Sequence, residues 1–243
     1  MNDTQSTVDV LALGAHHEDA DLGIGGTLLA LARQGFTTGI IDLTEGELGS
    51  RGTPGERVDE GQGAARRLGL SHRSSARLPD GGIQNIDSQR RALIPIIRTL
   101  RPKVLLVHQP PDRHPDHIAA AQLSRDANFF AGVTSIGTGH EPYRAPTVIG
   151  FRPYYDDAHE PELIMDISDV FEQKIEALRA YKSQFYNPDY QGPQTFIASE
   201  GFWQSIESRA RYWGNRAGFK FGEPLFYSGP LPVRTLAGLG GTE

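Results

Sequence analysis

Residues 8–33 read VDVLALGAHHEDADLGIGGTLLALAR, which is an apolar run, a polar turn and a second apolar segment in succession. Val8–Gly14 is apolar at nearly every position, as is typical of a strand that is buried on both faces. Gly23–Arg33 repeats its apolar residues at helical spacing, so it predicts a helix. The stretch therefore predicts a strand followed by a helix, with the polar turn at the carboxyl end of the strand.

The same order of strand and helix continues along the chain. Further strands are expected at 37–43, 104–107, 147–151 and 162–167, with a third, short strand that ends at 76–78. Further helices are expected at 56–68, 88–100 with a kink at Pro95, 117–129, 170–185 and 205–218. This alternation predicts an α/β fold: a Rossmann-like, doubly wound, mainly parallel sheet with helices on both faces and a C-terminal α+β extension. We expect one domain over 1–243, with its core at 8–130 and the extension at 145–233.

The composition excludes several classes of protein. The chain has 243 residues with 30 acidic and 24 basic side chains, and its net charge of -6 argues against a nucleic-acid binder. It has no cysteine, which excludes disulfides, thiolate metal sites and cysteine nucleophiles. No stretch approaches the roughly 20 apolar residues of a membrane span, and the first residues lack the basic region of a signal peptide. We expect a cytoplasmic protein that binds neither nucleic acid nor membrane.

Two polar motifs follow predicted strands. AHHED, at 15–19, follows the first strand, and DRHPDH, at 112–117, follows the strand at 104–107; together they hold four of the eight histidines. In a doubly wound sheet of order 3-2-1-4-5, the first and fourth strands are neighbours at the switch point, where ligands bind outside the carboxyl ends. The sequence therefore predicts that both motifs line one crevice.

The residue types in these motifs suit a metal centre. His16 and Asp19 are three residues apart, as are His114 and His117, and residues three apart share a face of a helical turn. Two histidines and one carboxylate with an open position form the pattern of catalytic zinc. A spare carboxylate, Glu18, would act as general base, and a spare imidazole would stabilise an oxyanion. The pattern predicts a metal-assisted hydrolase of amides or esters.

Simpler explanations exist for each motif taken alone. Each is more often a solvated turn or a helix start, where Asp and Pro are common; their joint placement favours the functional interpretation. The glycines at 23–26 lack the G-x-G-x-x-G spacing of a nicotinamide-dependent oxidoreductase and predict close helix–sheet packing instead. Arg51 lies between glycines after the second strand, and Arg51 and Arg113 are candidates for contact with an anion or a sugar.

At these residues the chain resembles the LmbE/PIG-L family of zinc-dependent deacetylases, whose members carry A-H-P-D-D and H-P-D-H at these two places. DLTEGELGSRGTPGERVDEGQGAARRLGL, LPDGGIQN and MDISDVFEQKIEALRAYKSQF resemble the bacillithiol-biosynthesis branch, whose enzymes deacetylate N-acetylglucosaminyl-malate. The resemblance runs from about residue 8 to about residue 233. It implies a homo-oligomer, with a hexamer as one candidate state.

The resemblance implies a role for each motif residue. His16, Asp19 and His117 would bind zinc, or ferrous iron as the alternative metal. Glu18 takes the position of the family's general base, and His114 that of the group which assists at the oxyanion and the leaving amine.

Further residues would support them. Asp116 would orient His114 through a hydrogen bond, and Arg51 corresponds to the family's arginine that meets the polar substrate. Arg113 is a second candidate for the same contact. The expected partner is a small amino-sugar conjugate.

The first motif departs from the family pattern at two positions. His17 stands in place of the proline, which would fix the backbone near φ −65°. Glu18 stands in place of aspartate and is one methylene longer. We expect no metal contact from His17, because neighbouring residues do not share a face of a helical turn.

We therefore expect a zinc-dependent N-deacetylase of an N-acetylglucosamine conjugate, with N-acetylglucosaminyl-malate as the first candidate. The alternatives are another N-acetylglucosamine conjugate or a chito-oligosaccharide as substrate. Because of the two departures, a non-catalytic metal-binding homologue is a further alternative.

Overall fold

The computed structural model describes residues 7–154 and 159–230. Its main sheet contains five strands: β1 (Val10–Gly14), β2 (Thr38–Asp42), β3 (His72–Ser75), β4 (Val104–His108) and β5 (Thr147–Phe151). All neighbouring strands are parallel, and their order is β3-β2-β1-β4-β5. This confirms the predicted α/β class and the predicted pairing of the first strand with the fourth.

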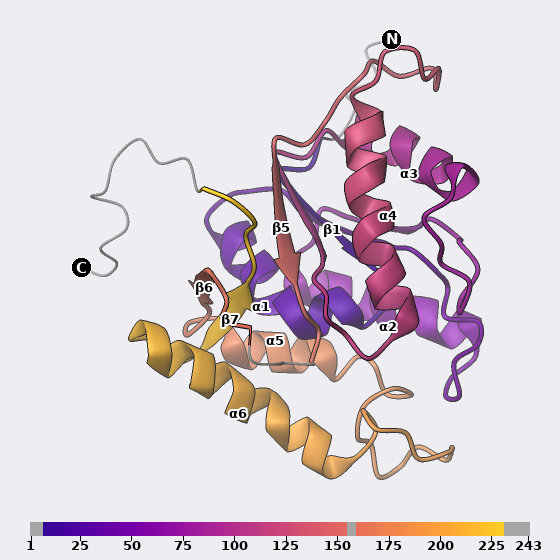
Figure 1. Cartoon of the computed structure of the whole chain (residues 1–243). Coiled ribbons are helices and arrows are strands. Elements are labelled where there is room, and N and C mark those ends of the chain that lie inside the picture. Colours follow the sequence, from indigo (N-terminus) through magenta and orange to yellow (C-terminus); the bar gives the residue numbers. More distant parts are fainter. Residues whose placement is uncertain (1–6, 155–158, 231–243) are drawn as a thin grey trace.

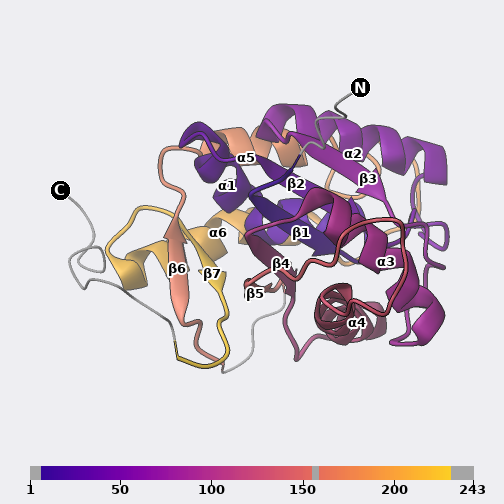
Figure 2. The same cartoon turned by 90° about the horizontal axis from the view of Figure 1, so that it is seen from above.

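Helices cover both faces of the sheet (Figure 2). One face carries α1 (Asp19–Arg33), α2 (Pro54–Leu68) and α5 (Phe171–Leu178), and the other carries α3 (Asp87–Leu100) and α4 (Pro115–Ala131). Successive side chains of β1 point to opposite faces: Val10 and Ala12 pack in the cluster that includes α1, whereas Leu11 and Leu13 pack with α3 and α4. Every residue of β1 is buried, which explains its continuous apolar sequence.

A smaller sheet lies beside the main one (Figure 1). It pairs β6 (Leu163–Asp166) with β7 (Gly222–Leu225) in antiparallel fashion, and it packs with α6 (Glu200–Ala217). The strand β5, which lies within the predicted extension, belongs to the main sheet. Among residues 7–154 and 159–230, no helix has the length and the hydropathy that crossing a bilayer requires.

Several predicted boundaries were wrong. The third strand, expected to end at 76–78, comprises the polar residues 72–75, because it is an edge strand whose sequence shows no apolar run. The helix expected at 170–185 ends at Leu178, and α6 begins at Glu200 because the hydroxyl of Ser199 accepts a hydrogen bond from the N–H of Phe202. Helix α3 continues through Pro95, and the strand β7 was missed. The part of the C-terminal tail from residue 231 lies outside the described residues.

The glycines at 23–26 pack closely, as predicted. A Cβ atom added at Gly23 would lie 2.9 Å from the ring of Phe151, and one at Gly26 would lie 2.9 Å from Glu223. Helix α1 therefore needs glycine where it approaches β5 and β7.

A buried ion pair ties α1 to the smaller sheet. Helix α1 is interrupted at Ile24 (φ −142°), and the Glu223 carboxylate accepts the backbone N–H of Gly26 at 2.9 Å. The ammonium group of Lys174 donates to the same carboxylate at 2.6 Å and to the carbonyl of Leu22 at 2.7 Å. Lys174 and Glu223 are 3% and 2% exposed, so each charge depends on the other. The pair therefore holds the start of α1, and α1 begins at Asp19, the last residue of the first motif.

Removing one partner of this pair should destabilise the fold strongly. We expect Glu223→Ala to lower the free energy of unfolding by about 3–5 kcal/mol, because it leaves the Lys174 ammonium buried and unpaired. Urea titration followed by circular dichroism measures this. Arg91→Ala, which breaks an exposed pair with Asp87, is the control and should change stability by less than about 1 kcal/mol. Equal effects of the two variants would contradict the assignment.

Candidate functional site

The fold brings the two motifs together. Strand β1 pairs with β4 in register from Val10↔Val104 to Leu13↔Val107, so their carboxyl ends lie side by side. The first motif continues from β1 into α1, and the second precedes α4. The ring centroids of His16 and His117 are 5.5 Å apart, and those of His16 and His114 are 4.8 Å apart. The two motifs therefore meet at one sheet edge, as predicted.

Three buried side chains form a compact donor set. One ligand atom from each of His16, Asp19 and His117 lies within 4.8 Å of the others. Asp19 Oδ2 is 3.2 Å from His16 Nδ1 and 3.2 Å from His117 Nε2. Two imidazole nitrogens and one carboxylate oxygen that converge in this way fit a metal ion with room for a further ligand. The donor set does not identify the metal, since this chemistry suits both zinc and ferrous iron.

Carboxylates hold the outward nitrogens of both imidazoles. His16 Nε2 lies 3.1 Å from Asp80 Oδ1, and His117 Nδ1 lies 2.9 Å from Asp112 Oδ2. Such contacts fix the tautomer and orientation of a ligating imidazole, here leaving Nδ1 of His16 and Nε2 of His117 to face Asp19. Sequence reasoning missed both carboxylates as supporting groups. Asp112 belongs to the second motif, but Asp80 is 64 residues from His16, and only its place after the predicted strand at 76–78 hinted at it.

The carboxylates attract positive charge to the centre. Burial alone would lower the pKa of His117, but Asp19 and Asp112 outweigh it and raise that pKa to about 9. Burial likewise opposes charge on His16, yet Asp116, Asp19 and Asp80 raise its pKa well above its usual value. Burial would raise the pKa of Asp19, but the imidazoles of His117, His108 and His16 lower it well below its usual value. The carboxylates around His16 and His117 therefore stabilise positive charge at this centre.

His108 forms an uncharged wall that sequence reasoning did not identify. It ends β4, and its Nε2 accepts a hydrogen bond from the N–H of Ala15 at 2.9 Å. Its ring stacks on that of His117 at 4.4 Å. Burial lowers its pKa to about 4, and the charge of His117 acts in the same direction. His108 is thus a neutral packing partner of the centre.

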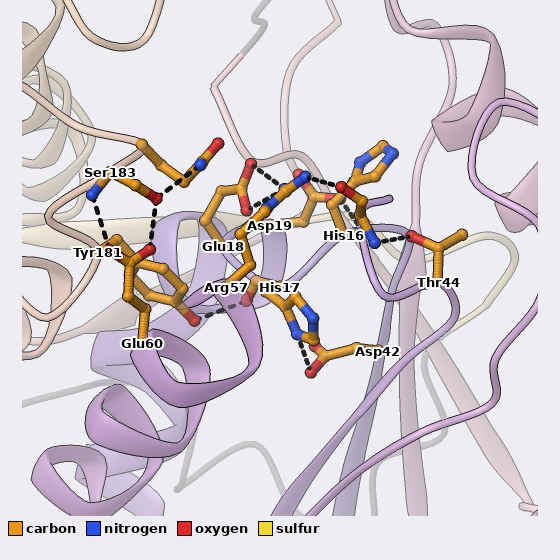
Figure 3. Close-up of polar contacts among 12 residues, drawn as sticks. His16, His17, Glu18, Asp19, Asp42, Thr44, Arg57, Glu60, Tyr181 and Ser183 are labelled. Atoms are coloured by element: carbon orange, nitrogen blue, oxygen red, sulfur yellow. Dashed lines mark hydrogen bonds and ion pairs between the residues drawn. The ribbon is translucent and has the colours of Figure 1, made fainter. Parts of the chain in front are cut away.

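The predicted base, Glu18, has a partner that its motif did not reveal. The carboxylate of Glu18 lies 3.0 and 3.2 Å from Nη2 of Arg57, a buried residue of α2 (Figure 3). Arg57 also donates from Nη1 to the carbonyl of Gly46 at 2.7 Å. Arg57 is 39 residues from Glu18, so no local spacing connects the two.

His17 turns away from the centre (Figure 3). Its Nδ1 lies 2.7 Å from Asp42 Oδ2, and its carbonyl accepts hydrogen bonds from the hydroxyl of Tyr181, at 2.7 Å, and from Arg73. Arg73 also pairs with Asp42 and with Asp21 at 3.0 Å. These contacts fix the backbone at the position where the family has proline.

The structure changes the expected relation between His114 and Asp116. His114 Nδ1 accepts from the backbone N–H of Asp116 at 3.2 Å, as the residue that caps α4. The Asp116 carboxylate does not make this contact; it accepts from the N–H of Gly81 at 2.8 Å and of Ile83 at 3.4 Å, and it lies 3.6 Å from His16 Nε2. The start of α4 thus orients His114 through its backbone.

The two candidate arginines have different surroundings. Arg51 is buried; it donates to the carbonyls of Ser183 and Pro193, and its guanidinium lies 4.6 Å from the ring centre of Tyr190. It therefore holds the segment 183–193 through contacts that the sequence did not predict. Arg113 is exposed.

Two aromatic side chains flank Arg113. Its guanidinium lies 4.4 Å from the ring centre of Phe196 and 5.4 Å from that of Tyr154, whose ring is 6.2 Å from that of His117. Arg113 is thus placed at the mouth of the centre.

Comparison with known proteins identifies the family. The family model for PIG-L, described as GlcNAc-PI de-N-acetylase, matches residues 11–128. The crystal structure of a conserved protein from Thermus thermophilus is 35% identical, has a TM-score of 0.84, and covers 95% of this chain and 98% of its own. The chain belongs to the PIG-L family.

Among the proteins similar to this PIG-L chain, some are named as deacetylases and one is named as a hydratase. The diacetylchitobiose deacetylase of Thermococcus kodakarensis is 29% identical over 89% of this chain and 81% of its own length. The 4-oxalmesaconate hydratase of Pseudomonas putida is 26% identical over 78% of each. The family resemblance seen in the motifs is confirmed, and the hydratase makes reaction type a question for the site's own residues.

The outer carboxylates should matter for metal affinity. We expect Asp112→Asn and Asp80→Asn each to weaken metal binding about 10–100-fold, because each removes the charge that orients a ligating imidazole. Competition with a chromophoric chelator measures this for zinc and for ferrous iron. Asp87→Asn, an exposed change on α3, is the control. Unchanged affinity in both variants would show that His16 and His117 do not bind the metal through Nδ1 and Nε2.

Proposed function

We propose that this protein is a metal-dependent N-deacetylase that hydrolyses the acetamide of an N-acetylglucosamine conjugate. The observation that carries the proposal is the buried set of His16, Asp19 and His117, with Glu18 and His114 beside it at one sheet edge. The family membership and the relatives named as deacetylases support it.

The proposed metal is zinc, with ferrous iron as the alternative. Held by His16, Asp19 and His117, such an ion would supply a Lewis acid that polarises the acetamide carbonyl and acidifies water. Glu18 accepts the proton of the water whose oxygen attacks the carbonyl carbon. The C–N bond then breaks, the amine nitrogen takes up a proton, and acetate and the free amino sugar are the products.

His114 is suited to donate a hydrogen bond to the oxyanion. Burial lowers the pKa of His114 below its usual value, so the imidazole is neutral near neutral pH. Because Nδ1 accepts the N–H of Asp116, the proton of the neutral ring resides on Nε2. Nε2–H is then a fixed donor that needs no proton transfer before it acts.

The proposed substrate is N-acetylglucosaminyl-malate, as in bacillithiol biosynthesis. Arg113 supports an anionic substrate, because it is exposed at the mouth and makes no ion pair with a carboxylate in the part of the chain that the structure describes. A chito-oligosaccharide is the alternative, supported by the relative from Thermococcus. A homo-oligomeric state and a cytoplasmic location remain predictions.

Metal content and amine release test the proposal together. We expect about one zinc or iron per chain and chelator-sensitive release of amine from N-acetylglucosaminyl-malate, from diacetylchitobiose or from both. Bound metal without amine release, together with hydration of 4-oxalmesaconate, would place the protein with the hydratase instead. Absence of bound metal would overturn the donor-set assignment.

Replacing the base should separate chemistry from metal binding. We expect Glu18→Gln to lower kcat about 10²–10⁴-fold while metal content stays unchanged, because an amide cannot accept the proton of water. Steady-state amine release and elemental analysis measure both quantities. Near-full activity of the metal-loaded variant would show that another group is the base.

Substrate preference should depend on Arg113. We expect Arg113→Gln to raise KM for N-acetylglucosaminyl-malate about tenfold or more, the value of a hydrogen bond between charged groups, and to leave KM for diacetylchitobiose within twofold. Arg144→Gln is the matched control, because Arg144 is also exposed and stacks on a phenylalanine, Phe129, at 4.1 Å. Arg144 lies before the amino end of β5, whereas the centre lies at the carboxyl ends of β1 and β4. Equal changes for both substrates would argue against a carboxylate contact.

A further inference from the structure

The loop between β2 and α2 is rich in glycine for a steric reason. A Cβ atom added at Gly46 would lie 2.2 Å from Nη1 of Arg57, and one at Gly49 would lie 2.4 Å from the same atom. Gly46 also has φ +67°, which other residues rarely adopt. The two glycines therefore leave a notch that the guanidinium of Arg57 fills.

The notch directs Arg57 toward Glu18. With Nη1 bound to the carbonyl of Gly46 at 2.7 Å, the planar guanidinium presents Nη2 to both oxygens of the Glu18 carboxylate. Because Glu18 directly precedes Asp19, the guanidinium of Arg57 lies beside the metal centre. Only one nitrogen contacts the carboxylate, which leaves further lone pairs of its oxygens open.

A glutamate at this position needs such a contact. Its backbone is fixed on both sides, by the bonds to the carbonyl of His17 and by the place of Asp19 in the centre. Its side chain has one more rotatable bond than the family's aspartate, and ordering it costs conformational entropy. The longer side chain therefore needs an anchor at the carboxylate itself, which Arg57 contacts at 3.0 and 3.2 Å.

We propose that Arg57, seated in the notch of Gly46 and Gly49, is the positioning residue that holds the carboxylate of Glu18 for proton transfer. This inference rests on the proposed function, in which Glu18 is the base. Displacing the guanidinium should lower the rate of the chemical step and spare both metal binding and substrate binding.

Gly49→Ala tests this without changing any charged group. We expect the added methyl group to displace the Arg57 guanidinium and to lower kcat about 10–100-fold, since a displacement of about 1 Å can cost about a hundredfold in rate. KM should stay within twofold, and metal content should not change. Gly55→Ala is the matched control, because a Cβ atom at Gly55, in the first turn of α2, meets nothing within 4 Å.

Arg57→Lys is an independent variant that keeps the charge. A single ammonium group cannot reproduce the fork that joins the Gly46 carbonyl to Glu18, so we expect the same loss of kcat. Arg66→Lys, at an exposed position of the same helix, should have no effect. Should Gly49→Ala fail to fold, as judged by thermal unfolding, Arg57→Lys carries the test.

A second background distinguishes positioning from a general effect on the loop. In Glu18→Asp the shorter carboxylate withdraws from Arg57, so adding Gly49→Ala should lower kcat much less than in the parent. The same loss in both backgrounds, unchanged kcat in Gly49→Ala and Arg57→Lys, or a change in KM alone would each overturn the inference. A parent protein that releases no amine from either substrate would instead refute the proposed function.

Discussion

The parallel pairing of β1 with β4 is the constraint on which the site depends. Because the two strands run in the same direction and in register, the segments that leave them meet at one sheet edge, although they are separated by about a hundred residues of chain. Two helices begin there, and their first turns carry Asp19 and His117 into contact.

Charged groups of both signs surround the three donor side chains at this junction. Asp80 and Asp112 each contact the outward nitrogen of one imidazole. Two arginines lie beyond them: Arg57 contacts Glu18, and Arg73 contacts Asp42, which also binds His17. Asp80, Asp112, Glu18 and Asp42 therefore each lie against an imidazole or a guanidinium, which is the condition under which these carboxylates can be buried together.

The sequence was sufficient for features that depend on local pattern. The apolar strands β1, β2, β4 and β5 and the order in which they pair could be predicted, because apolar runs encode them. The spacing within the two motifs indicated a metal centre, and the resemblance to the family supplied the choice of His16, Asp19 and His117 as its donors. Partners such as Asp80 and Arg57 could not, since they come from loops and helices that only the tertiary fold brings near. The early end of α5 had the same origin: Tyr181 and Ser183 leave the helix to bond the carbonyl of His17 and the carboxylate of Glu60, and helical periodicity carries no sign of this.

The bond from the hydroxyl of Tyr181 to the carbonyl of His17 has a consequence for how such enzymes can be altered. The segment that begins at Tyr181 continues into the loop that Arg51 holds, and that loop reaches Arg113 at Phe196. One end of this segment therefore supports the backbone beside Glu18, the proposed base, and the other packs against Arg113. We therefore expect a loop transplanted from a relative to keep its contacts with this turn only if residues 51, 60 and 181 are transplanted with it.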